Sequence, residues 1–289
     1  MSAPTGGSEH VADVAVDGLT LRVSVRHAGA GSQRTPLLLV NGIGAELGLL
    51  DPFVAALPAD LETVRFDPPG VGSSPAPVLP YPLAGLATVV DDLLTRLGHG
   101  RVDVLGFSWG GALAQQLALS ARHRVRRLVL VATGTGALMV PGPPSVLARM
   151  LTGRRYRDPD HAREVAGRIY GGTMRTRPEQ AAEVLGAGRS AGPGDRGYRY
   201  QLLAAASWTS LPFLPLLRVP TLVVAGEDDP IVPLVNARIL HRGIAGSQLH
   251  VHPGGHLALL TEPRELAPVV DDFLAAPDEP GAARAGRPA

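Results

Sequence analysis

Short apolar runs alternate with longer amphipathic segments over most of this chain, and this alternation restricts its fold more than any other feature. The apolar runs are bounded by turn residues and predict central strands at 36–40, 63–66, 102–106, 127–131, 221–225 and 248–251. Helical periodicity is found at 83–97, at 109–121 and from Pro263 to Leu274. Strands that alternate with helices predict an α/β fold, with a mostly parallel sheet covered by helices on both faces.

Two regions depart from this alternation. Residues 11–26 predict an antiparallel hairpin that turns at Asp17 and Gly18. Between 133 and 220 only short helical segments occur, separated by Pro- and Gly-rich turns, at 145–151, 161–169, 179–185 and 200–207. We therefore expect a helical cap, residues 134–217, inserted into a core formed by 11–133 and 218–274, although extra sheet-covering helices are an alternative. Residues 1–10 and the Pro-, Ala-, Gly- and Arg-rich residues 275–289 are expected to be disordered.

Composition excludes several classes of function. The 289 residues contain 27 basic and 26 acidic side chains, a net charge of +1, so the chain lacks the basic surface expected of a nucleic-acid-binding protein. Cysteine is absent, which excludes disulfides, thiolate metal sites and cysteine nucleophiles, and every basic residue is Arg, which excludes lysine Schiff-base chemistry. Residues 1–10 lack the features of a signal peptide, and no apolar run reaches the roughly 18 residues of a transmembrane helix. We expect a cytoplasmic protein without a transmembrane segment.

A candidate nucleophile lies between a predicted strand and a predicted helix. Gly106-Phe107-Ser108-Trp109-Gly110 matches Gly-x-Ser-x-Gly, in which a serine at a strained strand-to-helix turn exposes its hydroxyl above the sheet. A glycine two residues before and after the serine avoids Cβ collisions across the turn. The alternative is a buried serine in a glycine-rich turn, but the strand-turn-helix setting favours a nucleophile.

A serine nucleophile needs a base to take its proton and an acid to orient that base. His256 follows the last predicted strand and precedes the last helix, which suits the base, whereas His250 and His252 alternate along the strand itself. The acid is expected in Gly226-Glu-Asp-Asp-Pro230, which follows the strand at 221–225 and offers three adjacent carboxylates. The order serine, acid, histidine is that of α/β-hydrolases.

An oxyanion hole should combine the backbone N–H of Trp109, which follows the nucleophile, with an N–H from the loop after an earlier strand. Asn41-Gly42-Ile43-Gly44 follows the strand at 36–40, and we select Ile43. The same loop, with Gly48 and with Asp67 further on, resembles a dinucleotide-binding fingerprint, but its third glycine falls one residue late. A nucleotide site is therefore the weaker interpretation.

Longer stretches of the chain resemble the intracellular medium-chain-length poly(3-hydroxyalkanoate) depolymerases of the α/β-hydrolase superfamily. The resemblance covers roughly residues 36–274. It is carried by Asn41-Gly-Ile-Gly-Ala45, Phe66-Asp-Pro-Pro-Gly-Val-Gly72, Ser108-Trp-Gly-Gly-Ala-Leu-Ala-Gln-Gln116, Met139-Val-Pro-Gly142, Arg154-Arg-Tyr156, Ile169-Tyr-Gly-Gly172, Trp208-Thr-Ser210, Ala225-Gly-Glu-Asp-Asp-Pro-Ile-Val-Pro233 and Gly255-His256. The strings within the expected cap are the most particular to these enzymes.

The resemblance implies Asp229 as the triad acid, three residues after Gly226, and an α/β-hydrolase fold. It also implies a serine ester hydrolase that cleaves storage polyester inside the cell without a cofactor. No metal is expected, and the polyester granule surface is a candidate partner that the sequence does not decide. Met139, Val140, Trp208 and Phe213 are candidates to line a trough for alkyl side chains, although ordinary packing within the cap is the alternative for at least half of the cap's apolar residues.

Two other functions remain open. A carboxylesterase, lactonase or perhydrolase for small molecules can use the same triad, because a fold does not fix its substrate. A ligand-binding protein that keeps the hydrolase fold without turnover is the alternative from another class. An intact nucleophile, base, acid and hole argues against it. Serine at the nucleophile position argues against dehalogenases and epoxide hydrolases of this fold, which use aspartate.

Overall fold

The computed structural model describes residues 8–29, 31–186 and 194–277. Its centre is one eight-stranded sheet with the strand order β1-β2-β4-β3-β5-β6-β7-β8. The strands are β1 (Glu9–Val16), β2 (Leu19–Arg26), β3 (Leu37–Val40), β4 (Thr63–Phe66), β5 (Val102–Phe107), β6 (Val125–Val131), β7 (Thr221–Gly226) and β8 (Gln248–His252). β2 runs antiparallel to both β1 and β4, and every other pair is parallel. The α/β prediction is confirmed.

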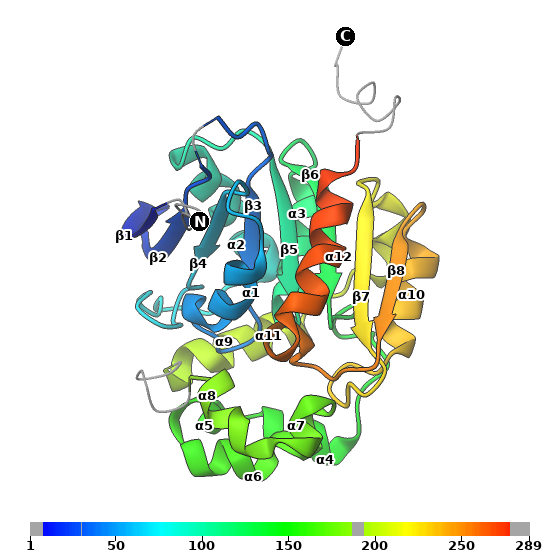
Figure 1. The fold of residues 1–289 in the computed structure, drawn as a ribbon. Helices are drawn as coiled ribbons and strands as arrows, with labels where there is room; N and C mark the ends of the chain where they lie inside the picture. The colour runs from blue at the N-terminus through cyan, green and yellow to red at the C-terminus, as the bar shows by residue number, and fades with distance from the viewer. Residues whose placement is uncertain (1–7, 30, 187–193, 278–289) are drawn as a thin grey trace, which may run out of the picture.

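Helices cover both faces of this sheet, because the parallel strands are apolar on both sides. Helices α1 and α12 pack together on one face, and α2 packs against α3 on the other (Figure 1). The elements that alternate with the strands are η1 (Leu47–Leu50), α1 (Asp51–Ala56), α2 (Leu83–Arg96), α3 (Trp109–Ser120), α10 (Val235–Gly243), α11 (Ala258–Thr261) and α12 (Pro263–Ala275).

The region between β6 and β7, which we call the inserted segment (residues 134–217), is built from short helices in the part that the structure describes. They are α4 (Pro144–Met150), α5 (Arg154–Arg157), α6 (Pro159–Tyr170), α7 (Thr173–Thr176), η2 (Pro178–Gln180), α8 (Ala181–Val184), α9 (Asp195–Ala206) and η3 (Leu211–Leu216). Figure 1 shows α4–α8 below the ends of the strands. The inserted segment therefore lies over the carboxyl edge of the parallel strands, where loops of such sheets form sites.

The structure also differs from the sequence-based expectations at the ends. Glu9 and His10 belong to β1 and pair with Arg26 and Val25 of β2, although residues 1–10 were expected to be disordered. Backbone pairing in the hairpin orders these polar residues. Residues 1–7 and 278–289 lie outside the described residues. None of the described helices is long and apolar enough to span a membrane.

Candidate active site

The strand-to-helix turn places Ser108 in a strained conformation. β5 ends at Phe107 and α3 begins at Trp109, so Ser108 alone forms the turn, with φ 54° and ψ −118°. A positive φ in a residue other than glycine costs conformational free energy, so it persists only where the surrounding structure holds the backbone. The N–H of Ser108 donates to the carbonyl oxygen of Val131 at 2.9 Å, and its own carbonyl oxygen accepts from the Thr133 hydroxyl at 2.7 Å. The end of β6 and the residues directly after it therefore hold the turn.

Glycines make this turn possible by allowing close backbone approach. A Cβ on Gly106 would lie 2.5 Å from the carbonyl oxygen of Gly110, and a Cβ on Gly110 would collide with the carbonyl oxygens of Val40 and Asn41. Only glycine fits at either position, as the Gly-x-Ser-x-Gly pattern requires. The contact of Gly110 with Asn41 also brings the loop after β3 beside Ser108.

His256 lies between Ser108 and Asp229, in the loop between β8 and α11. Its Nε2 is 3.0 Å from Oγ of Ser108, and its Nδ1 is 2.8 Å from Oδ2 of Asp229. The N–H of His256 donates to the carbonyl oxygen of Tyr170 at 2.8 Å, and its ring stacks on the Tyr170 ring with a centroid distance of 6.3 Å. The inserted segment, which carries Tyr170, thus helps to orient the imidazole.

Only Asp229 among the three adjacent carboxylates contacts the imidazole. Its Oδ1 accepts from the N–H groups of Ile231 and Val232, both at 2.9 Å, which leaves Oδ2 for His256. Asp228 turns away: it pairs with Arg175 at 2.6 Å and accepts from the N–H of Gly172 at 2.7 Å. The hydrogen bond from Arg175 holds the pKa of Asp228 below its usual value. Asp228 therefore ties the inserted segment to the loop that carries Asp229.

The two predicted oxyanion-hole residues are available as backbone donors. Within the described chain, neither the N–H of Ile43 nor that of Trp109 donates a hydrogen bond to another residue. Gly42 brings the loop after β3 against the nucleophile, because a Cβ on it would lie 3.5 Å from Cβ of Ser108. Free N–H groups on either side of a serine can stabilise the negative charge of a tetrahedral intermediate.

Tyr156 and Gln201 also hold this loop, and local sequence patterns predicted neither role. The Tyr156 hydroxyl donates to the carbonyl oxygen of Ile43 at 2.9 Å, and the Gln201 side chain accepts from the N–H of Gly44 at 2.7 Å. Both residues belong to the inserted segment and meet the loop only through the tertiary fold. Their distances in sequence from Ile43 and Gly44 explain why local patterns did not reveal them.

Asp67 supports the same loop rather than a nucleotide. It is 2 % exposed, accepts from the N–H groups of Leu47 at 2.6 Å and of Ser73 at 3.2 Å, and would collide with a Cβ on Gly72. Burial raises the pKa of Asp67 to about 6. Its carboxylate joins η1 to the turn after β4, so the ribose contact of a dinucleotide fingerprint has no support here.

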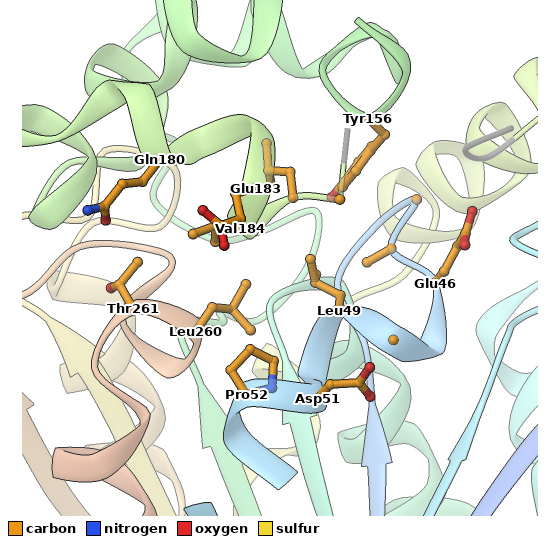
Figure 2. Close-up of a pocket in the computed structure, with 15 residues that line it drawn as sticks. Glu46, Leu49, Asp51, Pro52, Tyr156, Gln180, Glu183, Val184, Leu260 and Thr261 are labelled. Atoms are coloured by element: carbon orange, nitrogen blue, oxygen red, sulfur yellow. The ribbon is translucent and has the colours of Figure 1, made fainter. Parts of the chain in front are cut away.

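A cavity of about 680 Å³ opens between the inserted segment and the core, next to the oxyanion loop. Figure 2 shows Val184 of α8 across from Leu49 of η1 and Leu260 of α11, with Glu46 and Glu183 among the other lining residues. Gly44 and Ala45 line it too, directly after Ile43. The volume is within the usual range for a small-molecule site, and its wall combines aliphatic and acidic side chains.

The four apolar candidates from the sequence lie elsewhere, since none of them lines this cavity. Val140 exchanges backbone hydrogen bonds with the Asn236 side chain, and the indole of Trp208 donates to Oε1 of Gln116 at 2.7 Å. Met139 is partly buried against the core, and Phe213 on η3 is 48 % exposed. Met139, Val140 and Trp208 thus lie where the inserted segment joins the core.

With this geometry established, comparisons with known proteins give the family. Residues 35–263 match the model of the α/β-hydrolase fold family. The chain is 46 % identical over 261 residues to a poly(3-hydroxyalkanoate) depolymerase of Ectopseudomonas oleovorans, with 90 % of this chain and 91 % of that protein covered. It is 27 % identical to 3-oxoadipate enol-lactonase 2 of Acinetobacter baylyi, with 87 % and 93 % covered.

Solved structures agree with this assignment. The enol-lactonase from Burkholderia xenovorans superposes with a TM-score of 0.79 at 25 % identity, with 92 % of this chain and all of that chain covered. A hydrolase from Pseudomonas aeruginosa gives a TM-score of 0.78 at 29 % identity, covering 92 % and 98 %. The predicted resemblance is confirmed: the chain belongs to the α/β-hydrolase family and, within it, is a relative of a poly(3-hydroxyalkanoate) depolymerase.

Proposed function

We propose that this protein hydrolyses the ester bonds of poly(3-hydroxyalkanoate) through an acyl-enzyme on Ser108. The observation that carries the proposal is the chain of contacts from Asp229 through His256 to Ser108, at 2.8 and 3.0 Å, beside two free backbone N–H groups. The 46 % identity to a poly(3-hydroxyalkanoate) depolymerase supports this polyester as the substrate.

The geometry supports each step of ester hydrolysis. Neutral His256, with its Nδ1 proton held by Asp229, accepts the Ser108 proton at Nε2 as Oγ attacks the ester carbonyl. The N–H groups of Ile43 and Trp109 stabilise the oxyanion. The imidazolium then protonates the departing alcohol. In the second half the same histidine takes a proton from water as the water attacks the acyl carbonyl, and returns that proton to Oγ of Ser108 as the acid leaves. Asp229 stabilises the imidazolium formed in both halves.

We further propose that the inserted segment acts as a cap that sets substrate choice. Contacts of three kinds fasten it over the site: the Arg175–Asp228 ion pair, the hydrogen bond from Thr173 to Glu262 at 2.9 Å, and the close approach of Gly172 to Gly255. Neither Ser108 nor His256 lines the cavity between this cap and the core, but Gly44, the residue after Ile43, does; on that contact we place the substrate's chain there in the proposal.

The decisive experiment measures acid release from purified medium-chain and short-chain poly(3-hydroxyalkanoate), alongside soluble p-nitrophenyl esters. We expect hydrolysis of the medium-chain polymer, and a fluorophosphonate probe that labels wild-type protein but not Ser108→Ala. Turnover of soluble esters without turnover of either polymer would replace the polyester by a small ester or lactone. A small ester or lactone is the second candidate substrate because the chain is similar to two enol-lactonases.

A separate part of the proposal is that the protein is soluble inside the cell and binds the surface of the polymer. Incubating the Ser108→Ala protein with polyester particles and pelleting them tests surface binding without consuming the particles. Bovine serum albumin provides the control for nonspecific adsorption. Recovery of both proteins in the supernatant to the same extent would remove the polymer surface as a partner.

A further inference from the structure

Gln201 connects α9 to both sides of the oxyanion hole. Its Oε1 accepts from the N–H of Gly44 at 2.7 Å, and its carbonyl oxygen accepts from the indole Nε1 of Trp109 at 2.9 Å. Gly44 directly follows Ile43, one hole donor, and Trp109 supplies the other. The Gln201 side chain therefore contacts the residue next to one predicted hole donor, and its backbone contacts the side chain of the residue that supplies the other.

Close packing fixes α9 in this position. Gly197 lies one turn before Gln201, and a Cβ on it would collide with the carbonyl oxygen of Gly70 in the loop after β4. The hydroxyl of Tyr198 donates to the carbonyl oxygen of Met150 at 2.5 Å and accepts from Arg155 at 3.0 Å. Because backbone contacts and buried hydrogen bonds both position this helix, Gln201 is held against the loop after β3.

The amide nitrogen of Gln201 has no partner. The residue is 0 % exposed, and no acceptor contacts Nε2 within the described part of the chain. An unsatisfied buried donor is destabilising, so a buried amide N–H normally has an acceptor. Gln115 shows the usual arrangement in this protein: it is equally buried, but its Nε2 donates to the carbonyl oxygens of Gly111 and Gly134, both at 3.0 Å.

We propose that Nε2 of Gln201 donates a hydrogen bond to the oxygen on C3 of the substrate's acyl unit, an inference that rests on the proposed function. A 3-hydroxyalkanoyl unit carries oxygen at C3, whereas an ordinary fatty acyl group carries only hydrogen there. C3 is two carbons beyond the carbonyl whose oxygen would lie in the hole, so the C3 oxygen is only a few bonds from the loop that Gln201 contacts through Gly44. Gln201 is then a specificity-determining residue that selects 3-hydroxyacyl esters.

The experiment compares p-nitrophenyl 3-hydroxyoctanoate with p-nitrophenyl octanoate, which share chain length and leaving group. We expect the wild type to favour the 3-hydroxy ester in kcat/KM by at least about tenfold, because a site built to hydrogen-bond a substrate oxygen discriminates against the analogue that lacks it. Gln201→Met, which has a similar shape but no donor, should bring the ratio close to one.

Two further variants separate this effect from a change in folding. Gln201→Glu at alkaline pH still offers an oxygen to the N–H of Gly44 but has no proton to donate, so it should lose the preference while still hydrolysing the octanoate. Gln115→Glu disturbs an equally buried amide whose nitrogen is already satisfied. It should lower stability and leave the ratio of the two esters unchanged.

Each outcome decides the proposal. An unchanged ratio in both Gln201 variants overturns it, and an equal loss on both esters makes Gln201 a support of the oxyanion hole instead. A wild type that does not favour the 3-hydroxy ester also overturns it. Polyester hydrolysis, measured on the same preparations, tests the proposed function separately: selectivity that depends on Gln201 without polymer cleavage retains this inference and removes the polymer as substrate.

Discussion

The carboxyl edge of the sheet and the inserted segment meet at the candidate site, but their polar groups are used differently. At the sheet edge every member of the triad has its partner, and Asp229 uses one oxygen for two backbone N–H groups and the other for His256. In the inserted segment, Gln201 keeps a buried donor without an acceptor. Unpartnered buried polar atoms occur in both regions, Asn41 Oδ1 in the loop after β3 among them, so it is the contact of Gln201 with Gly44 that links the inserted segment to substrate recognition in our proposal.

The largest expected effect contrasts two adjacent acids that serve these two regions. Asp229→Asn should lower kcat on a p-nitrophenyl ester by about 10⁴, because the amide favours the wrong imidazole tautomer. Asp228→Asn should cost less than about tenfold, because its ion pair with Arg175 is largely exposed and only ties the inserted segment down. The kcat of both variants is measured on protein shown by circular dichroism to be folded. The opposite ranking would assign the triad acid to Asp228.

The next prediction concerns the pH dependence of stability that the buried carboxyl group of Asp67 causes. Burial raises the pKa of Asp67 to about 6 from a usual value of 3.8. Between these values the folded protein binds more protons than the unfolded chain, so stability falls as pH rises from about 4 to 6. A shift of this size corresponds to a loss of at most about 3 kcal/mol.

Asp67→Asn should remove this part of the pH dependence, although it also weakens the loop because an amide offers only one acceptor to Leu47 and Ser73. Urea unfolding at several pH values measures the change in slope, with the exposed Asp60→Asn as the matched control. If wild-type protein and Asp67→Asn lose stability in parallel over this range, the buried carboxyl group is not the source.

Close packing between α9 and the core gives a smaller effect. Ala normally stabilises a helix relative to Gly by up to about 1 kcal/mol. At Gly197 the added Cβ would strike the backbone of Gly70, so Gly197→Ala should destabilise by about 1–3 kcal/mol and lower kcat/KM as α9 moves from the hole. Gly194→Ala is the control, because nothing lies within 4 Å of its Cβ. Similar stabilities for the two variants would argue against a tightly fixed α9.

The same contrast explains how far sequence reasoning reached. The strands and the Gly-x-Ser-x-Gly turn depend on apolar runs and glycines that are neighbours in sequence, so their positions could be predicted closely. The catalytic roles of Ser108, Asp229 and His256 remain predictions, but the structure brings these three side chains together.

Less of the inserted segment could be predicted, because its important contacts join residues that are far apart in sequence. Gln201 and Gly44 are 157 positions apart, and Tyr156 and Ile43 are 113 apart. Met139, Val140, Trp208 and Phe213 were chosen for their apolar character alone. Helix periodicity indicated α4, α6, α8 and α9 but could not show which of their faces met the core, so the cavity next to Gly44 was not predicted.

The smallest expected effect distinguishes the cavity from the apolar surface of the inserted segment. Val184 lines the cavity opposite Leu260, whereas Phe213 is 48 % exposed and lies outside it. If the acyl chain occupies this cavity, Val184→Ala removes contacts that a long chain makes and a short chain does not. We expect the preference for octanoyl over butanoyl p-nitrophenyl ester, as kcat/KM, to fall by about tenfold, the lower end of the range for one methylene in an apolar pocket. Phe213→Ala should change the preference by less than about twofold, since it removes only surface contacts. Labelling by a fluorophosphonate should persist in both variants. A larger change in Phe213→Ala than in Val184→Ala would place the chain against η3 and restore the trough expected from the sequence.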